Sequence, residues 1–258
     1  MLILLPPSEG KAEPTRGAPL DLSRLGSPEL TETRSRIIKA LTALSADPDE
    51  AARVLGLGPT QRDLVALNAR LAEAPTARAD RIYTGVLYDA LGFASLPPAA
   101  KRRAAARVSV VSSVFGLVRP ADRIGSYRLS GGVSLPGLGP VAGIWRDALG
   151  PAIADRLGGG LLVDLRSSTY AAFWRPTPAL APRVATVRVL HEKDGRRTVV
   201  SHFNKATKGR LVRDLLIAGA DPRTPVALAD ALADLGWHVE SGAPSRAGTR
   251  LDVVVASL

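Results

Sequence analysis

The sequence predicts an α/β fold: a single domain in which a mixed β-sheet is surrounded by helices. Short apolar runs at residues 1–5, 108–111 and 161–165 are typical of buried strands, and each ends in polar residues. Residues 184–203 alternate in polarity on both sides of a Lys-Asp-Gly turn, which predicts an antiparallel hairpin. Hairpins beside strand–helix units indicate a mixed sheet rather than a purely parallel one.

Periodicity and turn residues give the remaining elements in order. Ser27 is a candidate N-cap for the first helix, and Pro28 suits its first turn. Apolar residues at helical spacing predict helices over residues 28–44, 48–55, 60–71, 83–91, 99–106, 144–157, 205–218 and 226–235. The later strands are expected over residues 184–190, 198–203, 237–240 and 251–255, with loops in the glycine-rich residues 130–143.

Length and composition indicate a globular protein with one domain over residues 1–258. The chain is 46% hydrophobic and 22% charged, which is ordinary for a folded domain. It has no cysteine, and its three histidines show no close ligand spacing, so we expect no metal site and no cofactor. The apolar start is ended by Pro6-Pro7, and no apolar run reaches the length of a membrane span. We therefore expect a cytoplasmic protein without a membrane partner.

The formal net charge of +10 favours nucleic acids, phosphates or acidic metabolites as partners. Only six of the 34 basic residues are lysines, and the rest are arginines. Such a bias also arises from a GC-rich coding sequence without any function. The lysines are therefore more informative than the total charge.

Residues 48–71 resemble a helix-hairpin-helix. Leu55-Gly56-Leu57-Gly58 separates two short helices, and in such a motif the backbone amides after the glycines meet a DNA phosphate. Gly56, Gly58 and Arg62 are the expected contacts. The alternative is a plain pair of helices joined by a glycine cap, and local sequence leaves both open.

Polar side chains gather where the three apolar strands end. Ligands of α/β proteins collect outside the carboxyl ends of strands, so one shared cleft is expected. Each serine alone is equally well explained as a helix cap, and the charged residues after the first strand as a solvated loop. The expected cleft residues from these strand ends are Ser8, Glu9, Lys11, Ser112, Ser113, Asp164, Ser167 and Tyr170.

Two further basic segments are expected to supply an anion clamp. Lys205 and Lys208 are placed in the first turn of a helix, where cations oppose the helix dipole, and Arg210 follows them. Arg119 and Arg128 carry guanidinium groups of the kind that hold phosphates or carboxylates. A solvated basic face is the alternative for the lysine segment.

Six segments, in this serial order, resemble the peroxide stress protein YaaA family over about residues 1–240. They are residues 1–5 with the following polar loop, 83–85, 113–120, 127–128, 164–170 and 205–209. The resemblance implies a single α/β domain with a helix-hairpin-helix and a positively charged cleft. It also implies binding of double-stranded DNA and a role in limiting iron-driven oxidative damage during peroxide stress.

We therefore expect a DNA-binding stress protein that contacts the duplex backbone. The alternative is an enzyme that acts on a nucleotide-like or other anionic small molecule in the same cleft. Candidate catalytic residues are Glu9, Lys11, Asp164, Ser167 and Tyr170. Candidate DNA- or anion-binding residues are Gly56, Gly58, Arg62, Lys11, Arg119, Arg128, Lys205, Lys208 and Arg210.

Overall fold

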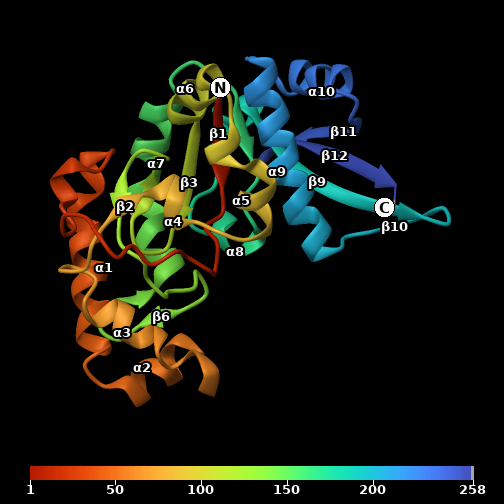
Figure 1. The fold of residues 1–258 in the computed structure, drawn as a ribbon. Helices are drawn as coiled ribbons and strands as arrows, with labels where there is room; N and C mark the ends of the chain where they lie inside the picture. Colours follow the sequence, from red (N-terminus) through yellow and green to blue (C-terminus); the bar gives the residue numbers. More distant parts are fainter. Residues whose placement is uncertain (257–258) are drawn as a thin grey trace.

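An eight-stranded mixed sheet forms the centre of the molecule (Figure 1). The structure, a computed structural model, describes residues 1–256, except for the side chains of Ser201 and His202. The strands lie in the order β11-β12-β9-β8-β1-β3-β4, and β10 pairs with β9 beside this path. Strands β12, β9, β8, β1 and β3 run parallel, whereas β4, β10 and β11 are antiparallel to their neighbours. The predicted α/β fold with a mixed sheet is confirmed.

The elements have the following bounds. The strands of this sheet are β1 (Leu2–Leu5), β3 (Val108–Ser112), β4 (Gly116–Val118), β8 (Leu162–Asp164), β9 (Val184–Lys193), β10 (Arg196–Thr198), β11 (His238–Ser245) and β12 (Gly248–Ala256). Short ladders join β2 (Ala77–Arg78) to β5 (Arg123–Ile124) and β6 (Ser134–Leu135) to β7 (Gly139–Pro140). The helices are α1 (Thr31–Leu44), α2 (Pro48–Leu55), α3 (Leu64–Ala69), α4 (Ala79–Ile82), α5 (Val86–Leu91), α6 (Pro98–Arg107), α7 (Val141–Leu157), α8 (Ser168–Ala171), α9 (Ser201–Ala218) and α10 (Pro225–Asp234).

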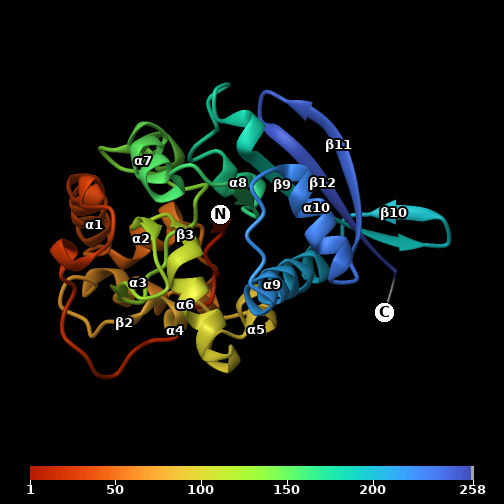
Figure 2. The same ribbon diagram turned by 90° about the horizontal axis from the view of Figure 1, so that it is seen from above.

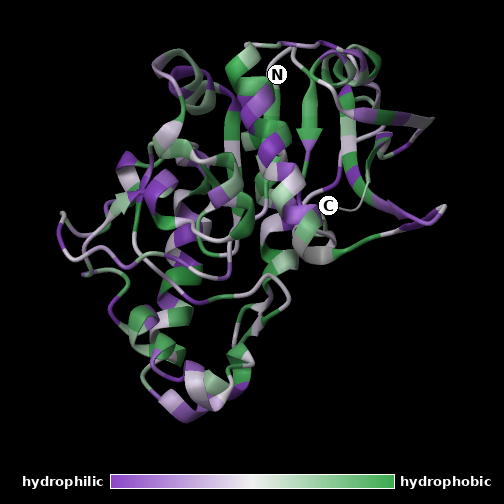
Figure 3. Ribbon diagram, turned by 45° about the vertical axis from the view of Figure 1, so that its right-hand side comes forward, coloured by the Kyte–Doolittle hydropathy of each residue, from purple (hydrophilic) through white to green (hydrophobic). Residues whose placement is uncertain are grey.

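Helices cover the sheet on both faces, which explains the apolar strands. Figure 2 shows α5, α6, α9 and α10 along one face and α7 along the other. All four residues of β1 are buried, because a central parallel strand has no solvent face. In Figure 3 the central strands are largely hydrophobic, whereas the helices alternate between hydrophobic and hydrophilic residues.

The register brings three strand ends to one edge of the sheet. Leu4 of β1 pairs with Ser109 of β3 on one side and with Asp164 of β8 on the other. Because the three strands are parallel, the chain leaves all of them in the same direction. The loops after residues 5, 112 and 164 therefore meet, as the sequence predicts.

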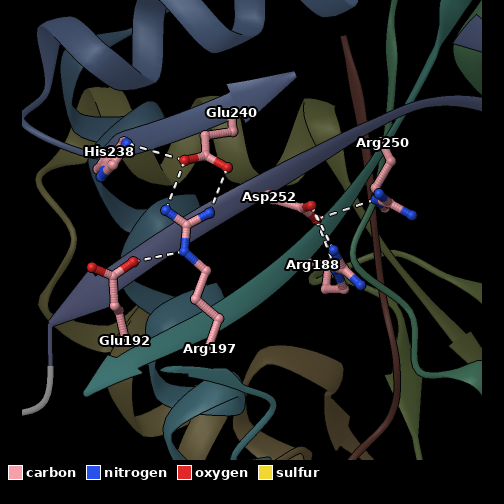
Figure 4. Close-up of polar contacts among 7 residues, drawn as sticks. All are labelled: Arg188, Glu192, Arg197, His238, Glu240, Arg250 and Asp252. Atoms are coloured by element: carbon pink, nitrogen blue, oxygen red, sulfur yellow. Dashed lines mark hydrogen bonds and ion pairs between the residues drawn. The ribbon is translucent and has the colours of Figure 1, made fainter. Parts of the chain in front are cut away.

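The outer end of the sheet carries a ladder of paired charges on its exposed face (Figure 4). Arg188 of β9 donates to both carboxylate oxygens of Asp252 on β12, at 2.8 and 2.6 Å. Arg197 similarly joins Glu240 at 2.7 and 3.0 Å and also contacts Glu192. Each of these cations has a carboxylate partner, so this face is a balanced polar surface.

One predicted boundary is wrong in a way that affects the site. The hairpin around Asp194 and Gly195 forms as predicted, with both residues at positive φ. Its second strand, however, ends at Thr198, and α9 begins at Ser201, within the strand expected over residues 198–203. Lys205 and Lys208 consequently lie beyond the first helical turn, and the argument from the helix dipole does not apply to them.

None of the helices in residues 1–256 combines the length and the hydropathy that crossing a bilayer requires.

Candidate ligand-binding cleft

A cavity of about 460 Å³ opens at the edge where β1, β3 and β8 end. Five of the residues singled out from the sequence line it: Ser8, Glu9, Ser167, Tyr170 and Lys205. Helix α5 supplies another wall through Val86, Leu87 and Tyr88. A cavity of this size suits a small metabolite or a mononucleotide.

Glu9 at the cavity wall forms an ion pair with Arg128. Arg128 lies in the loop before Leu129, and its own amide donates to the Asn68 side chain at 2.8 Å. The Asn68 amide donates in return to the Arg128 carbonyl at 2.8 Å. This reciprocal pair fixes the Arg128 backbone, so the arginine is held in position to neutralise Glu9.

Lys11 lies directly behind the cavity wall and has no carboxylate ion-pair partner among the residues that the structure describes. Its Nζ donates to the Ser8 carbonyl at 2.7 Å and sits 4.1 Å from the centre of the Tyr127 ring. Burial lowers the pKa of Lys11 to about 7; the negative charge of Glu9 opposes this shift and the positive charge of Arg128 adds to it. Lys11 therefore exchanges its proton near neutral pH.

A chain of hydroxyl groups lies beneath Lys11. The Ser112 hydroxyl is 2.8 Å from the Tyr127 hydroxyl, which is 3.2 Å from that of Tyr83. Burial raises the pKa of both phenols well above the usual range, so they stay protonated and act as hydrogen-bond partners. The sequence placed Ser112 among the expected cleft residues but did not connect its hydroxyl with those of Tyr83 and Tyr127, because only the tertiary fold brings residues 83, 112 and 127 together.

Asp164 is engaged with the arginine two residues later. Arg166 donates to its two carboxylate oxygens at 2.9 and 2.7 Å and to the carbonyls of Tyr170 and Trp174 at 3.1 Å each. Both side chains are buried. The pair holds the loop and α8 in place, so Asp164 supports the cleft rather than lining it.

Ser167 and Tyr170 reach the cavity from this braced segment. Ser167 is the N-cap residue of α8, but its hydroxyl makes no capping hydrogen bond. The hydroxyl is therefore available toward the cavity, and the explanation of Ser167 as a simple helix cap does not hold. Burial raises the pKa of Tyr170, so its phenol is neutral.

Helix α9 directs its cations to two different places. Lys205 lines the cleft, and Lys208 donates to the Leu165 carbonyl at 3.1 Å behind it. Gly209 packs so closely on α5 that a β-carbon there would lie 2.2 Å from the Leu87 carbonyl oxygen. Arg210 lines a separate cavity on the other side of the helix, so its grouping with the two lysines is wrong.

Arg119 does not line the cleft, contrary to the expectation from the sequence. After Phe115 the chain reverses, and β4 runs antiparallel to β3 with Val118 beside Val110. Residues after Val118 are thus carried away from the carboxyl edge. There the Arg119 Nε donates to the buried Asp122 at 3.1 Å, and Asp122 also accepts the Arg119 amide at 2.8 Å.

The hairpin at residues 48–71 does not establish a helix-hairpin-helix. Gly56 ends α2 in the left-handed conformation, and the amides of Gly56 and Leu57 donate back to carbonyls of that helix. Pro59, which has no amide hydrogen, opens the short 3-10 turn after Gly58. The arginines are paired: Arg53 with Glu50, Arg62 with Asp49 and Arg70 with Glu13.

The charge balance of the cleft differs from that of the hairpin. Glu9 and Asp164 are each neutralised by an arginine. Lys11, Lys205 and Lys208 remain without an ion-pair partner among the described residues. No group of three histidine or carboxylate side chains in the same part of the chain is arranged to hold a metal ion. The cleft is therefore suited to bind an anion.

Comparison with known proteins identifies the family. The family model described as peroxide stress protein YaaA matches residues 1–241. A UPF0246 protein of Streptomyces coelicolor is 52% identical over 258 residues, covering 99% of this chain and 98% of its own. A UPF0246 protein of Corynebacterium efficiens is 45% identical over 242 residues, covering 93% and 95%. An uncharacterised Campylobacter jejuni protein is 26% identical over 82% of this chain and 83% of its own length. The resemblance seen in the six sequence segments is thus confirmed, and the chain belongs to the peroxide stress protein YaaA family.

Proposed function

We propose that the cleft binds a phosphate-bearing small molecule of nucleotide type. The observation that supports this is the charge left over at the carboxyl edge: both carboxylates are paired with arginines, and the exposed Lys205 is not paired among the described residues. An anion placed beside Lys205 would gain a charge-assisted hydrogen bond without breaking an existing pair. Tyr88 and Tyr170 in the walls offer aromatic surface for a base.

An enzymatic role for the same cleft rests on Lys11. A lysine amine that loses its proton near pH 7 is suited to proton transfer, and the Ser112–Tyr127–Tyr83 hydroxyls lie beside it. Glu9, the other acid–base candidate, is held by Arg128 and would have to leave that pair to react. We therefore propose Lys11, rather than Glu9, as the proton-transfer group if the bound ligand is turned over.

A binding titration tests the proposal. AMP, ADP, inorganic phosphate and uncharged adenosine are titrated into the protein by calorimetry. The phosphorylated nucleotides should bind, and Lys205→Gln should weaken them about tenfold, corresponding to about 1.4 kcal/mol. Lys39→Gln, an exposed lysine of α1, is the matched control and should change nothing. Adenosine binding as tightly as AMP, or equal affinity in Lys205→Gln, would contradict an anion site at this position.

Backbone binding of duplex DNA is a second candidate function, favoured by the net charge of +10. Since the hairpin arginines are paired, we propose that phosphates meet the groove of about 370 Å³ between α4 and α6. Arg81 and Lys101 line this groove without ion partners in the part of the chain that the structure describes, and Arg78 there is paired with Asp80.

The DNA proposal predicts weak, sequence-tolerant binding that falls steeply with salt. A labelled duplex is titrated at about 50 mM and about 200 mM salt. The double variant Arg81→Gln/Lys101→Gln should lower the affinity for DNA and the slope of log affinity against log salt concentration. The double variant Arg62→Gln/Arg70→Gln should change both quantities less. A larger loss of affinity in the Arg62→Gln/Arg70→Gln variant would show that DNA contacts the hairpin instead. Binding that is insensitive to salt would exclude a contact with the DNA phosphates.

The family also suggests a cellular role, which we propose for this chain: limiting iron-driven oxidative damage during peroxide stress. Deletion of the gene should raise intracellular free iron and DNA damage after peroxide treatment, and the intact gene should restore both. Complementation with Lys205→Gln asks whether this role depends on the cleft. Full rescue by that variant would separate the stress role from the proposed ligand.

A further inference from the structure

A second cavity, of about 280 Å³, lies on the side of α9 that faces away from the cleft. Figure 2 shows α9 between α5 and α10. Lys205 and Gly209 face α5, whereas Phe203, Ala206, Thr207 and Arg210 recur at helical spacing on the other side and line this cavity. Its other walls are formed by His191 of β9, Trp237 before β11, and Val255 and Ala256 of β12. Helix α9 therefore separates two cavities with different linings.

The floor of this cavity contains a buried polar atom without a partner. His191 is 8% exposed, and its Nε2 makes no hydrogen bond to any described residue. Leaving such an atom unpaired costs about 1–3 kcal/mol, and native proteins pair nearly all buried polar atoms. The imidazole lies against the Phe203 ring, with ring centres 4.9 Å apart. Nε2 is itself shielded from solvent, and a ligand that bonds to it requires the Phe203 ring, which is 43% exposed near the start of α9, to turn aside.

The other walls indicate what fills the cavity. Phe203 and Trp237 provide aromatic surface, and the Trp237 ring is fixed by its hydrogen bond to Asp214 at 3.1 Å. Arg210 is exposed and has no ion partner among the described residues. Aromatic surface favours a flat ring, and a free guanidinium favours a carboxylate. The volume is smaller than that of the cleft and suits a single ring.

We propose that this cavity is a binding site for a small aromatic carboxylate. Its ring packs against Phe203 and Trp237, its carboxylate pairs with Arg210, and a polar substituent on the ring bonds to His191 Nε2. The site is separate from the cleft and does not depend on the function proposed for it.

The test uses 4-hydroxybenzoate as the probe and observes the imidazole signals of His191 by NMR. The chain has only three histidines, and His191→Phe assigns the signal directly. Addition of 4-hydroxybenzoate should shift the His191 signals saturably. Arg210→Gln should raise the Kd at least about tenfold. Lys205→Gln, on the opposite side of α9, should leave the Kd unchanged. Circular dichroism of each variant confirms that it is folded.

Two comparison ligands make the outcome decisive. Cyclohexanecarboxylate has the charge without the aromatic ring, and inorganic phosphate has the charge alone; both should bind much more weakly than 4-hydroxybenzoate. The proposal is overturned if the His191 signals do not respond at millimolar probe, if Arg210→Gln binds as well as the unmodified protein, or if cyclohexanecarboxylate binds equally. Weakening by Lys205→Gln instead of Arg210→Gln would place the probe in the cleft and would also overturn it.

Discussion

The cleft at the carboxyl edge and the hairpin at residues 48–71 contain similar residue types but use them differently. Both were expected to bind anions, and both contain several cations. In the hairpin, Arg53, Arg62 and Arg70 each have a carboxylate neighbour. In the cleft the arginines neutralise the carboxylates, and lysines are left over. The comparison shows that the pairing of a cation, rather than its presence, decides whether it is available to a ligand.

The largest expected effect separates buried from exposed ion pairs. Asp164→Asn should reduce the free energy of unfolding by about 3 kcal/mol or more, because Arg166 is left buried with an uncompensated charge. Asp49→Asn removes the exposed partner of Arg62 and should cost less than about 1 kcal/mol. Urea unfolding measures both values. Equal losses would show that the Asp164–Arg166 pair does not brace the cleft.

The next prediction concerns Lys11 and pH. The unfolded chain holds this proton up to about pH 10.5, whereas the folded protein releases it near pH 7. The unfolded state thus binds more protons in this window, so the contribution of Lys11 to stability rises with pH, by at most about 1.4 kcal/mol per pH unit. Lys11→Met should flatten the rise in unfolding free energy between pH 7 and 9. An unchanged slope in this variant would contradict the role of burial.

Binding of AMP to matched variants tests whether the cations of the hairpin or those of the cleft are available to a ligand. A hairpin variant with Arg53, Arg62 and Arg70 all changed to glutamine should bind AMP as the unmodified protein does. Lys205→Gln should bind it about tenfold more weakly. Calorimetry at constant pH and salt compares the two. If the hairpin variant loses as much affinity as Lys205→Gln, the difference drawn between the two regions is incorrect.

Within the hairpin, a helix cap should matter more than an ion pair. Asp47 accepts the amides of Asp49 and Glu50 at 3.1 Å each, and Asp47→Ala should cost about 1 kcal/mol. Arg62→Gln should cost only a few tenths of a kcal/mol, about the value of an exposed pair. Thermal unfolding of the two variants at the same pH and salt concentration measures both losses. A larger loss from Arg62→Gln would show that this pair holds the hairpin together.

Local sequence determined the fold class and most elements of this protein. Buried parallel strands such as β1 read as apolar runs, and the Asp194-Gly195 turn adopts the positive φ values that its residue types favour. The sequence also predicted that the polar residues 8, 112 and 164 at the strand ends lie near one another. Parallel strands all end at the same edge of a sheet, so the residues that follow them meet there. These features depend on backbone geometry and on neighbours in sequence, which the chain itself specifies.

Only the tertiary structure decided which polar groups are free. The antiparallel turn into β4 carries Arg119 away from the cleft, and the packing of Gly209 against α5 turns Lys205 toward the cleft and Arg210 toward the other cavity. Arg128 reaches Glu9 across 119 residues of chain, and Lys11 has no ion-pair partner in the described part of the chain. Ion pairing and burial depend on such distant neighbours. For that reason the sequence names the candidate residues of the site, whereas the fold alone sets their charge and accessibility.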